Sequence, residues 1–470
     1  MNKANDALLV DGAPTDAVIE TDHTKLEDAP DTAPGPVIEA QRKVRRYERR
    51  FKKARAALDK WREARAWMRT PASKRSRFGL DWMNFFMADI ETGFGTFVAF
   101  YLAGLGWSKG SVGLALGAGQ IAAVIGQIPG GALADALTWK RGLAAIGILM
   151  VCSSGLIFAL APFYPLVFTA EILHGLASGL IGPSIAGISL GLVGRKAMSS
   201  RTGRNYRFDA AGNALTAGAM GLMGSYFSTR VIFFAASALC LPALVALSQI
   251  RPREIDYRKA RNASADDGGT RIQSVKDIVK SRNLLLFTLC LILFQFADAS
   301  LLPLVAQNLG ADKGEPASLM TSGLIAVPQL VVVLLAPWVG YFSESVGRKP
   351  LLLVGFAVEA VRAALLGLVS NYTLVVLAQV LGGITSAIIG VMTVLVVTDL
   401  TTGTGRFNLT RGAVVTLSTI AASLSVAVSG FIFQGVGQFP TFAIFAGVAA
   451  TAALVAWFFL PETKPAEYLD

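Results

Sequence analysis

Long apolar runs of about twenty residues recur along most of the chain, and they constrain its fold more than any other feature of the sequence. A helix of ~20 apolar residues spans the hydrocarbon core of a bilayer. The chain is 53% hydrophobic and only 16% charged, unlike a soluble domain. The sequence therefore predicts an all-α membrane protein. Its twelve predicted transmembrane helices cover residues 79–103, 111–134, 142–160, 166–194, 208–227, 230–250, 284–306, 318–341, 350–369, 373–400, 412–433 and 441–460.

Lysine and arginine are concentrated in alternate loops between these spans. With the N-terminus inside, the inward loops carry twenty of these residues and the outward loops carry three. Positive charge in short loops stays on the cytoplasmic side. We therefore expect a multi-pass protein of the cytoplasmic (inner) membrane with both termini in the cytoplasm. A hydrophilic cytoplasmic linker, residues 251–283, separates two bundles of six spans, residues 78–250 and 284–460.

The segment before the first span has two parts, and we expect no cleavable signal peptide in it. Residues 1–40 are acidic and rich in Asp, Pro and Ala, which predicts a disordered cytoplasmic tail. Residues 41–77 hold sixteen Lys/Arg against three acids and an apolar stripe at helical spacing. They predict a basic amphipathic helix suited to an anionic lipid surface. Alternatively, this helix is solvated or forms a coiled coil, and its charge only fixes the topology. Residues 461–470 are predicted to be a cytoplasmic tail.

Several classes of function are disfavoured by what the sequence contains. The net charge of +11 is concentrated beside the predicted membrane, so it does not indicate nucleic-acid binding. Each of the three cysteines lies in an apolar run, which predicts neither disulfides nor a metal site. There is no catalytic triad and no Gly-rich Lys-Ser/Thr nucleotide motif. We expect neither an enzyme nor an ATP-driven pump, and no cofactor.

The two sets of six spans repeat each other at an offset of 208–209 residues. "AEILHGLASGLIG" at Ala170–Gly182 aligns with "AQVLGGITSAIIG" at Ala378–Gly390. Polar and small residues match at the same offset: Gln120 with Gln329, Gly131 with Gly340, Asp135 with Glu344, Ala88 with Ala297, and Asp89 with Asp298. Parallel six-span repeats are an architecture of secondary transporters, whose sites lie near the midplane between the halves. The repeat predicts two pseudo-symmetric six-helix bundles.

A loop motif in each half carries a family resemblance. "GYFSESVGRK" at Gly340–Lys349 resembles the signature G-x-x-x-D-R-x-G-R-K of the major facilitator superfamily, and "GALADALTWKR" keeps Gly131, Asp135 and Lys140 of it. The resemblance covers about residues 79–460. It implies the major facilitator fold, alternating access and a small-molecule substrate, and we expect a monomer. The glycine-rich fifth span resembles that of drug/proton antiporters, without their Gly-Pro step.

The signature loops predict a latch at the cytoplasmic side. Glycine near a helix end lets a neighbouring helix approach closely, and an acid there caps a helix N-terminus or pairs with a base. The resemblance places these loops opposite two "TGR" segments, which suggests pairing of Asp135 with Arg406 and of Glu344 with Arg204. Alternatively, the basic residues only set topology. The predicted gate residues are Gly131, Asp135, Lys140, Arg141, Arg204, Gly340, Glu344, Gly347, Arg348, Lys349 and Arg406.

Two acids in the first span raise the question of proton coupling. Asp89 and Glu91 point about 200° apart on a helix, so they are not a carboxylate pair. Asp89 and its repeat mate Asp298 are predicted to face the central cavity from opposite sides. Glu91 corresponds to Ser300 and is predicted to meet a basic partner or to be an asymmetric proton site.

Other ionisable residues at bilayer depth, each costing ~3 kcal/mol or more, mark further candidates. Glu171 and His174 lie three residues apart on one helix face and either pass a proton or form a packing hydrogen bond. Gln120 and Gln329 are predicted to line the cavity. The remaining candidates are structural: an intramembrane ion pair of Glu359 with Arg362, and a helix cap at Asp209.

These features together predict a secondary active transporter that exports a small organic solute in exchange for protons. One alternative is proton-linked uptake of a metabolite. A second is a lipid or glycolipid flippase on the same fold. A third, a membrane receptor without transport, is disfavoured by the mirrored acids in the two halves.

Overall fold

Twelve long helices of 17 to 30 residues occupy the part of the chain that the computed structural model describes. That part comprises residues 72–92, 98, 101–102, 104–226, 229–263, 280–305, 317–369 and 371–464. The helices are α2 (Lys74–Thr92), α4 (Lys109–Ala136), α5 (Lys140–Leu160), α6 (Tyr164–Val193), α7 (Met198–Tyr226), α8 (Thr229–Gln249), α11 (Arg282–Asp298), α13 (Ala317–Ser345), α14 (Arg348–Leu368), α15 (Tyr372–Leu400), α16 (Phe407–Val436) and α17 (Gln438–Phe459).

Each predicted span overlaps one of these helices, and ten of the helices are long and apolar enough to cross a membrane. The main difference lies at the helix ends. α7 begins at Met198 rather than 208, and α16 begins at Phe407 rather than 412. Hydropathy marks the part of a helix at bilayer depth, whereas the polar turns that extend beyond it still pack against the protein. Asp209 therefore lies inside α7, and its prediction as a helix cap is wrong.

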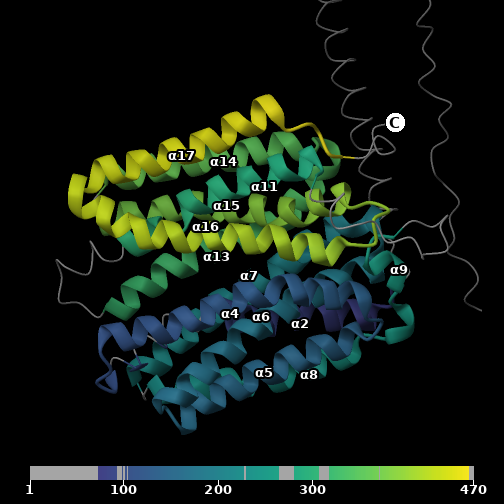
Figure 1. Ribbon diagram of the computed structural model, residues 1–470, viewed down its shortest axis with the longest axis horizontal. Coiled ribbons are helices and arrows are strands. Elements are labelled where there is room, and N and C mark those ends of the chain that lie inside the picture. The colour runs from purple at the N-terminus through teal and green to yellow at the C-terminus, as the bar shows by residue number, and fades with distance from the viewer. Residues whose placement is uncertain are drawn as a thin grey trace, which may run out of the picture. The chain divides into compact units, whose positions relative to one another are not determined.

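The helices form two sets of six, as the repeat predicts (Figure 1). In the first set α6 packs on α4 and α5, and α8 on α2 and α5; in the second set α14 packs on α15 and α17, and α13 on α15. The two sets meet mainly where α7 packs on α13 and where α4 packs on α16. The loops 137–139, 194–197, 346–347 and 401–406 lie at one end of the helices, which we call the basic end.

Glycines at equivalent positions of the two halves allow the two sets of helices to contact each other closely. A Cβ at Gly203 of α7 would lie 2.5 Å from the carbonyl oxygen of Ala336 on α13. The positions 209 residues away repeat the contact, because a Cβ at Gly412 of α16 would overlap the carbonyl of Gln127 on α4. Only glycine permits this approach of two backbones. The interface is therefore pseudo-symmetric at the level of single residues.

The start of the predicted linker also joins the two sets. A 3-10 turn, η3 (Pro252–Glu254), leads into the short helix α9 (Tyr257–Ala260), which packs against α6. Asn262 then donates a 2.7 Å hydrogen bond to the carbonyl of Thr398 on α15. Residues 264–279 lie outside the described part, as do the predicted tail 1–40 and residues 41–71 of the predicted amphipathic helix.

Candidate functional site

Asp135 joins the two halves at the basic end. It lies in the last turn of α4, and its carboxylate accepts hydrogen bonds from the backbone N–H of Asn408 at 3.1 Å and of Leu409 at 2.8 Å. The side-chain amide of Asn408 donates a third hydrogen bond at 2.8 Å. An acid at these first N–H groups of α16 satisfies donors that have no partner within the helix and complements the helix dipole. Asp135 is thus an N-cap supplied by the other half.

Glycines beside this cap allow it to form. A Cβ at Gly131, one turn before Asp135, would overlap the backbone of Asn408 on α16. At the equivalent place in the second half, a Cβ at Gly340 would lie 2.5 Å from the carbonyl oxygen of Ser199 on α7. The two signature glycines therefore serve the same purpose in both halves, which is close contact with the opposite half.

The cations of the first signature loop bind backbone carbonyls. Lys140 is almost fully buried and donates through Nζ to the carbonyl of Ala134 at the end of α4. Arg141 makes a long contact of 3.5 Å with the carbonyl of Ser248 on α8. Lysine near a helix C-terminus satisfies carbonyls that lack helical partners. These residues hold the α4–α5 loop in place rather than contacting the other half.

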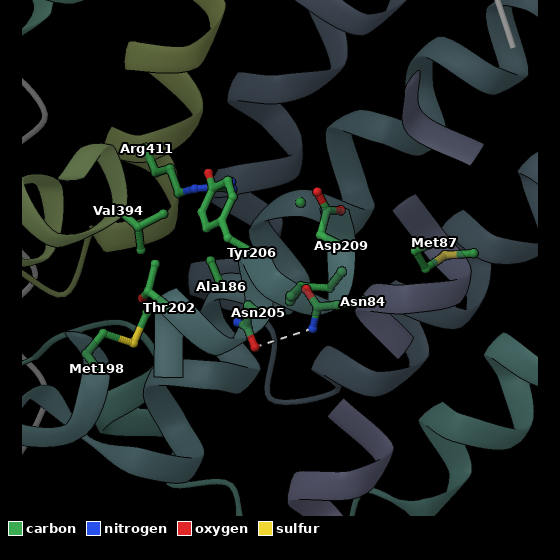
Figure 2. A pocket seen from close by; sticks show the side chains of 12 residues that line it. Asn84, Met87, Ala186, Met198, Thr202, Asn205, Tyr206, Asp209, Val394 and Arg411 are labelled. Atoms are coloured by element: carbon green, nitrogen blue, oxygen red, sulfur yellow. Dashed lines mark hydrogen bonds between the residues drawn. The ribbon is translucent and has the colours of Figure 1, made fainter. Parts of the chain in front are cut away.

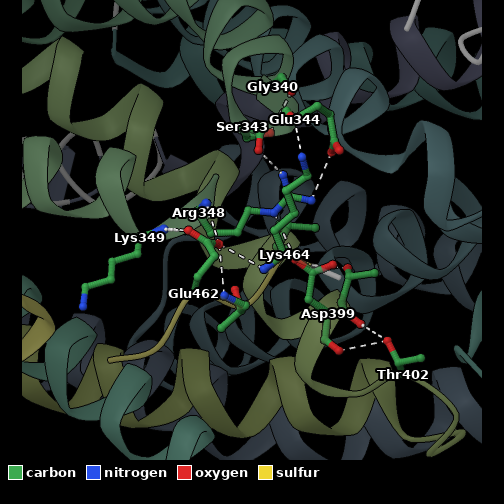
Figure 3. A network of polar contacts seen from close by, with 12 residues as sticks. Gly340, Ser343, Glu344, Arg348, Lys349, Asp399, Thr402, Glu462 and Lys464 are labelled. Atoms are coloured by element: carbon green, nitrogen blue, oxygen red, sulfur yellow. Dashed lines mark hydrogen bonds and ion pairs between the residues drawn. The ribbon is translucent and has the colours of Figure 1, made fainter. Parts of the chain in front are cut away.

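The second signature loop is organised around Arg348 (Figure 3). Its guanidinium binds Glu344 at 3.0 Å, Asp399 on α15 at 3.0 Å and the carbonyl of Ser343 at 2.7 Å. Glu462, beyond α17, accepts hydrogen bonds from the backbone N–H of Arg348 at 2.8 Å and of Lys349 at 3.1 Å. The side chain of Lys349 donates to a carbonyl near the end of α17.

Two features of this loop extend beyond the signature motif. Residues 461–464, the first of the predicted C-terminal tail, pack on the loop, because Glu462 caps α14 and Lys464 donates to the carbonyl of Glu344. Gly347 has φ +102°, a conformation that favours glycine, and a Cβ there would meet Glu462. This glycine therefore stabilises the loop rather than the contact between halves.

The two ion pairs suggested for the gate are absent, and both suggestions were wrong for this conformation. Arg204 binds Asp81 on α2 through Nη2 at 2.6 Å, and Glu344 binds Arg348. Asp135 binds the start of α16 instead of Arg406, which precedes that helix. The reason is register: the "TGR" segments are 202 residues apart, whereas the structural repeat is 209, so Arg204 and Arg406 are not equivalent.

A basic hollow lies where α2 and α7 begin. Arg201 also binds Asp81, at 2.5 Å, so one buried carboxylate holds two guanidinium groups. The hollow has a volume of about 410 Å³ and is lined by four cations and one acid. These charged residues are Lys74, Arg77, Asp81, Arg201 and Arg204.

Glu171 differs from the other acids in the described part of the chain. It is only 6% exposed, and it faces Gly119 of α4, where a Cβ would overlap its carboxylate. None of the described residues forms an ion pair or a hydrogen bond with its side chain. Burying an unpaired charge is so costly that the group takes up a proton or recruits water instead. His174 is half-buried one turn further along α6.

The equivalent place in the second half holds a connected ion cluster. Arg362 of α14 binds Asp298 of α11 at 2.5 Å and Glu359, which is fully buried, at 3.0 Å. Its Nη2 donates to Gln379, the repeat mate of Glu171, at 3.0 Å. The suggested intramembrane ion pair is present, and it also includes Asp298, which the sequence analysis had treated separately.

The remaining predicted cavity residues are only partly described. Asp89 and Glu91 lie in the last turn of α2, and their side chains fall outside the description. Whether Asp89 faces Asp298 therefore stays a prediction. Gln120 is exposed on α4, and Gln329 is half-buried on α13.

A cavity of about 130 Å³ lies between the two halves (Figure 2). Its walls come from α2, α6 and α7 of the first half and from α15 and α16 of the second. The polar lining residues are Asn84, Thr202, Asn205, Tyr206, Asp209 and Arg411. In Figure 2 the side chain of Arg411 extends toward the ring of Tyr206. This arrangement gives the interface a polar chamber that both halves build.

The sequence analysis missed several residues of these sites, among them Asp81, Asp399, Asn408 and Arg411. Asp81 and Asp399 lie just inside the ends of apolar runs, and Asn408 and Arg411 lie just before one. An acid at such a border was a detectable signal, since ionisable residues there need a partner. Their partners on other helices could not be read from the chain.

Comparison with known proteins decides the family. The family model described as Major Facilitator Superfamily matches residues 80–331 and 299–469. The chain belongs to the major facilitator superfamily. It is therefore a multi-pass membrane transporter, as the signature loops predicted, and not an enzyme. Its family supports secondary active transport of a solute.

Two relatives of this chain support the family assignment, and one solved structure supports the fold. The uncharacterized MFS-type transporters Rv2456c and MT2531, from two strains of Mycobacterium tuberculosis (ATCC 25618 / H37Rv and CDC 1551 / Oshkosh), are each 35% identical over 387 residues. Each match covers 82% of this chain and 93% of the relative. The solved structure of the proton:xylose symporter XylE bound to 6-bromo-6-deoxy-D-glucose matches with a TM-score of 0.62 at 17% identity. It covers 83% of this chain and 96% of that one, which supports the fold.

Proposed function

We propose that this transporter exports a small organic solute across the cytoplasmic membrane in exchange for protons, with its basic end and both termini in the cytoplasm. The observation that carries the proposal is Glu171, a buried carboxylate without a cation, at the contact of α6 with α4. The orientation is supported by the concentration of Lys/Arg in the loops of the basic end.

The position of Glu171 links proton binding to the gate. It contacts α4 at Gly119, and the last turn of α4 carries Asp135, which caps α16 of the other half. A neutral Glu171 is compatible with its close contact with Gly119 of α4. A charged Glu171 favours separation of α4 from α6 and hydration of the carboxylate. Proton release is thus expected to move α4 and to weaken the cap at its far end.

The ion cluster in the second half is the better candidate for a fixed scaffold. Arg362 neutralises one of the two acids that it binds and supplies hydrogen bonds to both. In the first half the positions equivalent to Arg362 are Ser153 and Ser154, so Glu171 has no such cation. This difference between the halves is the reason to assign the coupled proton to Glu171, with Asp89 and Glu91 as further candidates on α2.

Everted membrane vesicles test the proposal. Respiration acidifies their lumen, and solutes from a panel of amines, carboxylic acids, sugars and nucleosides are added outside while a pH-sensitive dye reports the lumen. Export by exchange predicts lumenal alkalinisation by at least one class, lost in Glu171→Gln and retained in Glu254→Gln, a carboxylate control outside the membrane. Unchanged coupling in Glu171→Gln would refute the assignment. Proton movement only in right-side-out vesicles would instead support uptake by symport.

Anionic lipid is proposed as a second partner at the start of α2. The hollow lined by Lys74, Arg77, Arg201 and Arg204 has an excess of three positive charges over Asp81. Basic pockets at this membrane boundary suit lipid phosphates. A Lys74→Gln/Arg77→Gln variant should lose binding of phosphatidylglycerol but not of phosphatidylcholine in nanodiscs. An equal effect on both lipids would contradict the proposal.

A further inference from the structure

Two polar side chains that line the cavity between the halves have donors without partners. Thr202 is 2% exposed, and its Oγ1 has no hydrogen-bond partner in the described structure. Arg411 is half-buried, and its Nε likewise has none. Buried polar atoms usually have a hydrogen-bond partner, so these two atoms in one cavity are available to a ligand or to ordered water.

The charge of Arg411 is also uncompensated. The arginines of the described helices that are almost fully buried bind carboxylates: Arg201 binds Asp81, Arg348 binds Glu344 and Asp399, and Arg362 binds Asp298 and Glu359. Within the described residues, no carboxylate lies within 4.0 Å of the Arg411 nitrogens. Asp209 also lines this cavity. A guanidinium that lines a cavity without a carboxylate partner is a candidate binding group for an anion.

The repeat adds a separate argument. Thr202 of α7 and Arg411 of α16 lie 209 residues apart, which is the offset of the structural repeat, so they occupy equivalent positions in the two halves. Their neighbours Gly203 and Gly412 make equivalent backbone contacts with the opposite halves. The fold therefore accepts a neutral residue at this position, and helix packing does not explain the arginine.

We propose that this cavity binds the carboxylate of a small organic anion through the guanidinium of Arg411 and the hydroxyl of Thr202. Arginine presents parallel donors that match a carboxylate, and charge-assisted hydrogen bonds of this type are the stronger ones. The volume of about 130 Å³ is below the ~300 Å³ at which drug-sized pockets begin, so the site accepts a small acid or the acidic end of a larger one. The inference rests on the proposed function in that it takes this anion to be the transported solute.

The lining explains how such a ligand would be selected and released. The aromatic ring of Tyr206 and the apolar side chains of Met87, Met198 and Val394 surround the polar groups. They lower the polarity around the guanidinium, which strengthens its interaction with a carboxylate. Because α7 and α16 belong to different halves, a ligand held by both Thr202 and Arg411 binds one relative position of the halves best.

Direct binding tests the proposal without any proton gradient. Purified full-length protein in detergent is titrated by calorimetry with propionate, pyruvate, succinate and benzoate, each beside its neutral amide, and with inorganic phosphate. At least one carboxylate should bind and its amide should not. Arg411→Gln should weaken that binding by about tenfold or more, Thr202→Val by a few-fold, and Arg411→Lys by less than Arg411→Gln.

Several results would overturn the proposal. They are binding of no carboxylate, equal binding of acid and amide, phosphate binding in place of the carboxylates, or unchanged affinity in a folded Arg411→Gln protein. Circular dichroism melting checks that each variant is folded, and Gly430→Ala, at a site with open space around it, is the control. A negative binding result would not change the result of the vesicle assay of proton exchange, and a negative vesicle assay would not change this binding result. The two proposals can therefore fail separately.

Discussion

The carboxylate of Asp135 accepts a 2.8 Å hydrogen bond from the backbone N–H of Leu409, which lies on the opposite six-helix half. A helix N-terminus in one half is thereby capped by an acid from the other. The contact needs no basic residue, and it breaks if the halves separate at this end. We propose this contact as the gate of the transporter.

Removal of this cap should open the basic end. Asp135→Ala leaves the first N–H groups of α16 without their acceptor, and loss of an N-cap costs about 0.5–2 kcal/mol. A change of 1–2 kcal/mol shifts a two-state population about five- to thirty-fold. We expect faster alkylation of a cysteine at position 198, which lines the cavity, on a background with Cys152, Cys240 and Cys290 replaced by alanine.

Asp135→Asn is the matched variant for that experiment. It keeps an acceptor oxygen but loses the charge, so its alkylation rate should fall between those of the parent and of Asp135→Ala. Equal rates in all three proteins would show that this cap does not hold the halves together.

Alanine at either signature glycine should have the same effect as loss of the cap. A Cβ at Gly131 or Gly340 would meet backbone of the opposite half, and backbone cannot rotate away. We expect Gly131→Ala and Gly340→Ala each to increase the reactivity of a cysteine at position 198. Gly113→Ala, at a site with open space, is the control. An effect of Gly113→Ala as large as that of the other two would point to general helix destabilisation instead.

Substitutions of different members of the ion cluster in the second half should destabilise the protein by different amounts. Arg362→Gln leaves the fully buried Glu359 without a cation, which costs about 3–5 kcal/mol for a buried pair. Glu359→Gln should cost less, because Asp298 still binds the arginine. The double variant should be more stable than Arg362→Gln alone in thermal melts. Additive losses would exclude an energetic coupling between the two residues.

A carboxylate outside the membrane gives a pH-dependent contact. Glu254 accepts a 2.9 Å hydrogen bond from the N–H of Ser73, just before α2. Burial acts to raise the pKa of Glu254, but hydrogen bonds from Ser73 and Ser76, with nearby Arg251, hold that pKa below its ordinary value. A pKa that is lower in the folded state contributes stability above the unfolded value of about 4.3, and this is lost as the pH falls through the folded pKa.

Hydrogen exchange checks this contact. The first turn of α2 should be better protected in the parent than in Glu254→Gln at pH 7, and the difference should shrink progressively as the pH falls below about 4.3. A difference that does not change with pH would mean that the charge of Glu254 is not its cause.

The sequence analysis predicted the fold more accurately than it predicted the contacts between charged side chains. Apolar runs near bilayer length and a repeated glycine–acid spacing were enough to predict twelve helices in two halves. Both features recur along the sequence and can be recognised without knowing any contact. The partner of a charged side chain depends on helix register. Arg204 is an example. The repeated "TGR" sequence suggested that it pairs with Glu344, whereas in the structure it binds Asp81, two turns into α2. Arg411 was overlooked for a related reason, since it lies before the apolar run and reads as a loop residue until α16 is seen to start at Phe407.

Distance measurement across the basic end tests the central claim most directly. Spin labels at the exposed positions 138 and 402 report the separation of the halves in lipid nanodiscs by pulsed electron resonance. The account predicts two distances whose populations change with pH in the parent, a pH-independent mixture in Glu171→Gln, and a shift to the longer distance in Asp135→Ala. A single distance in the parent that does not respond to pH would contradict it.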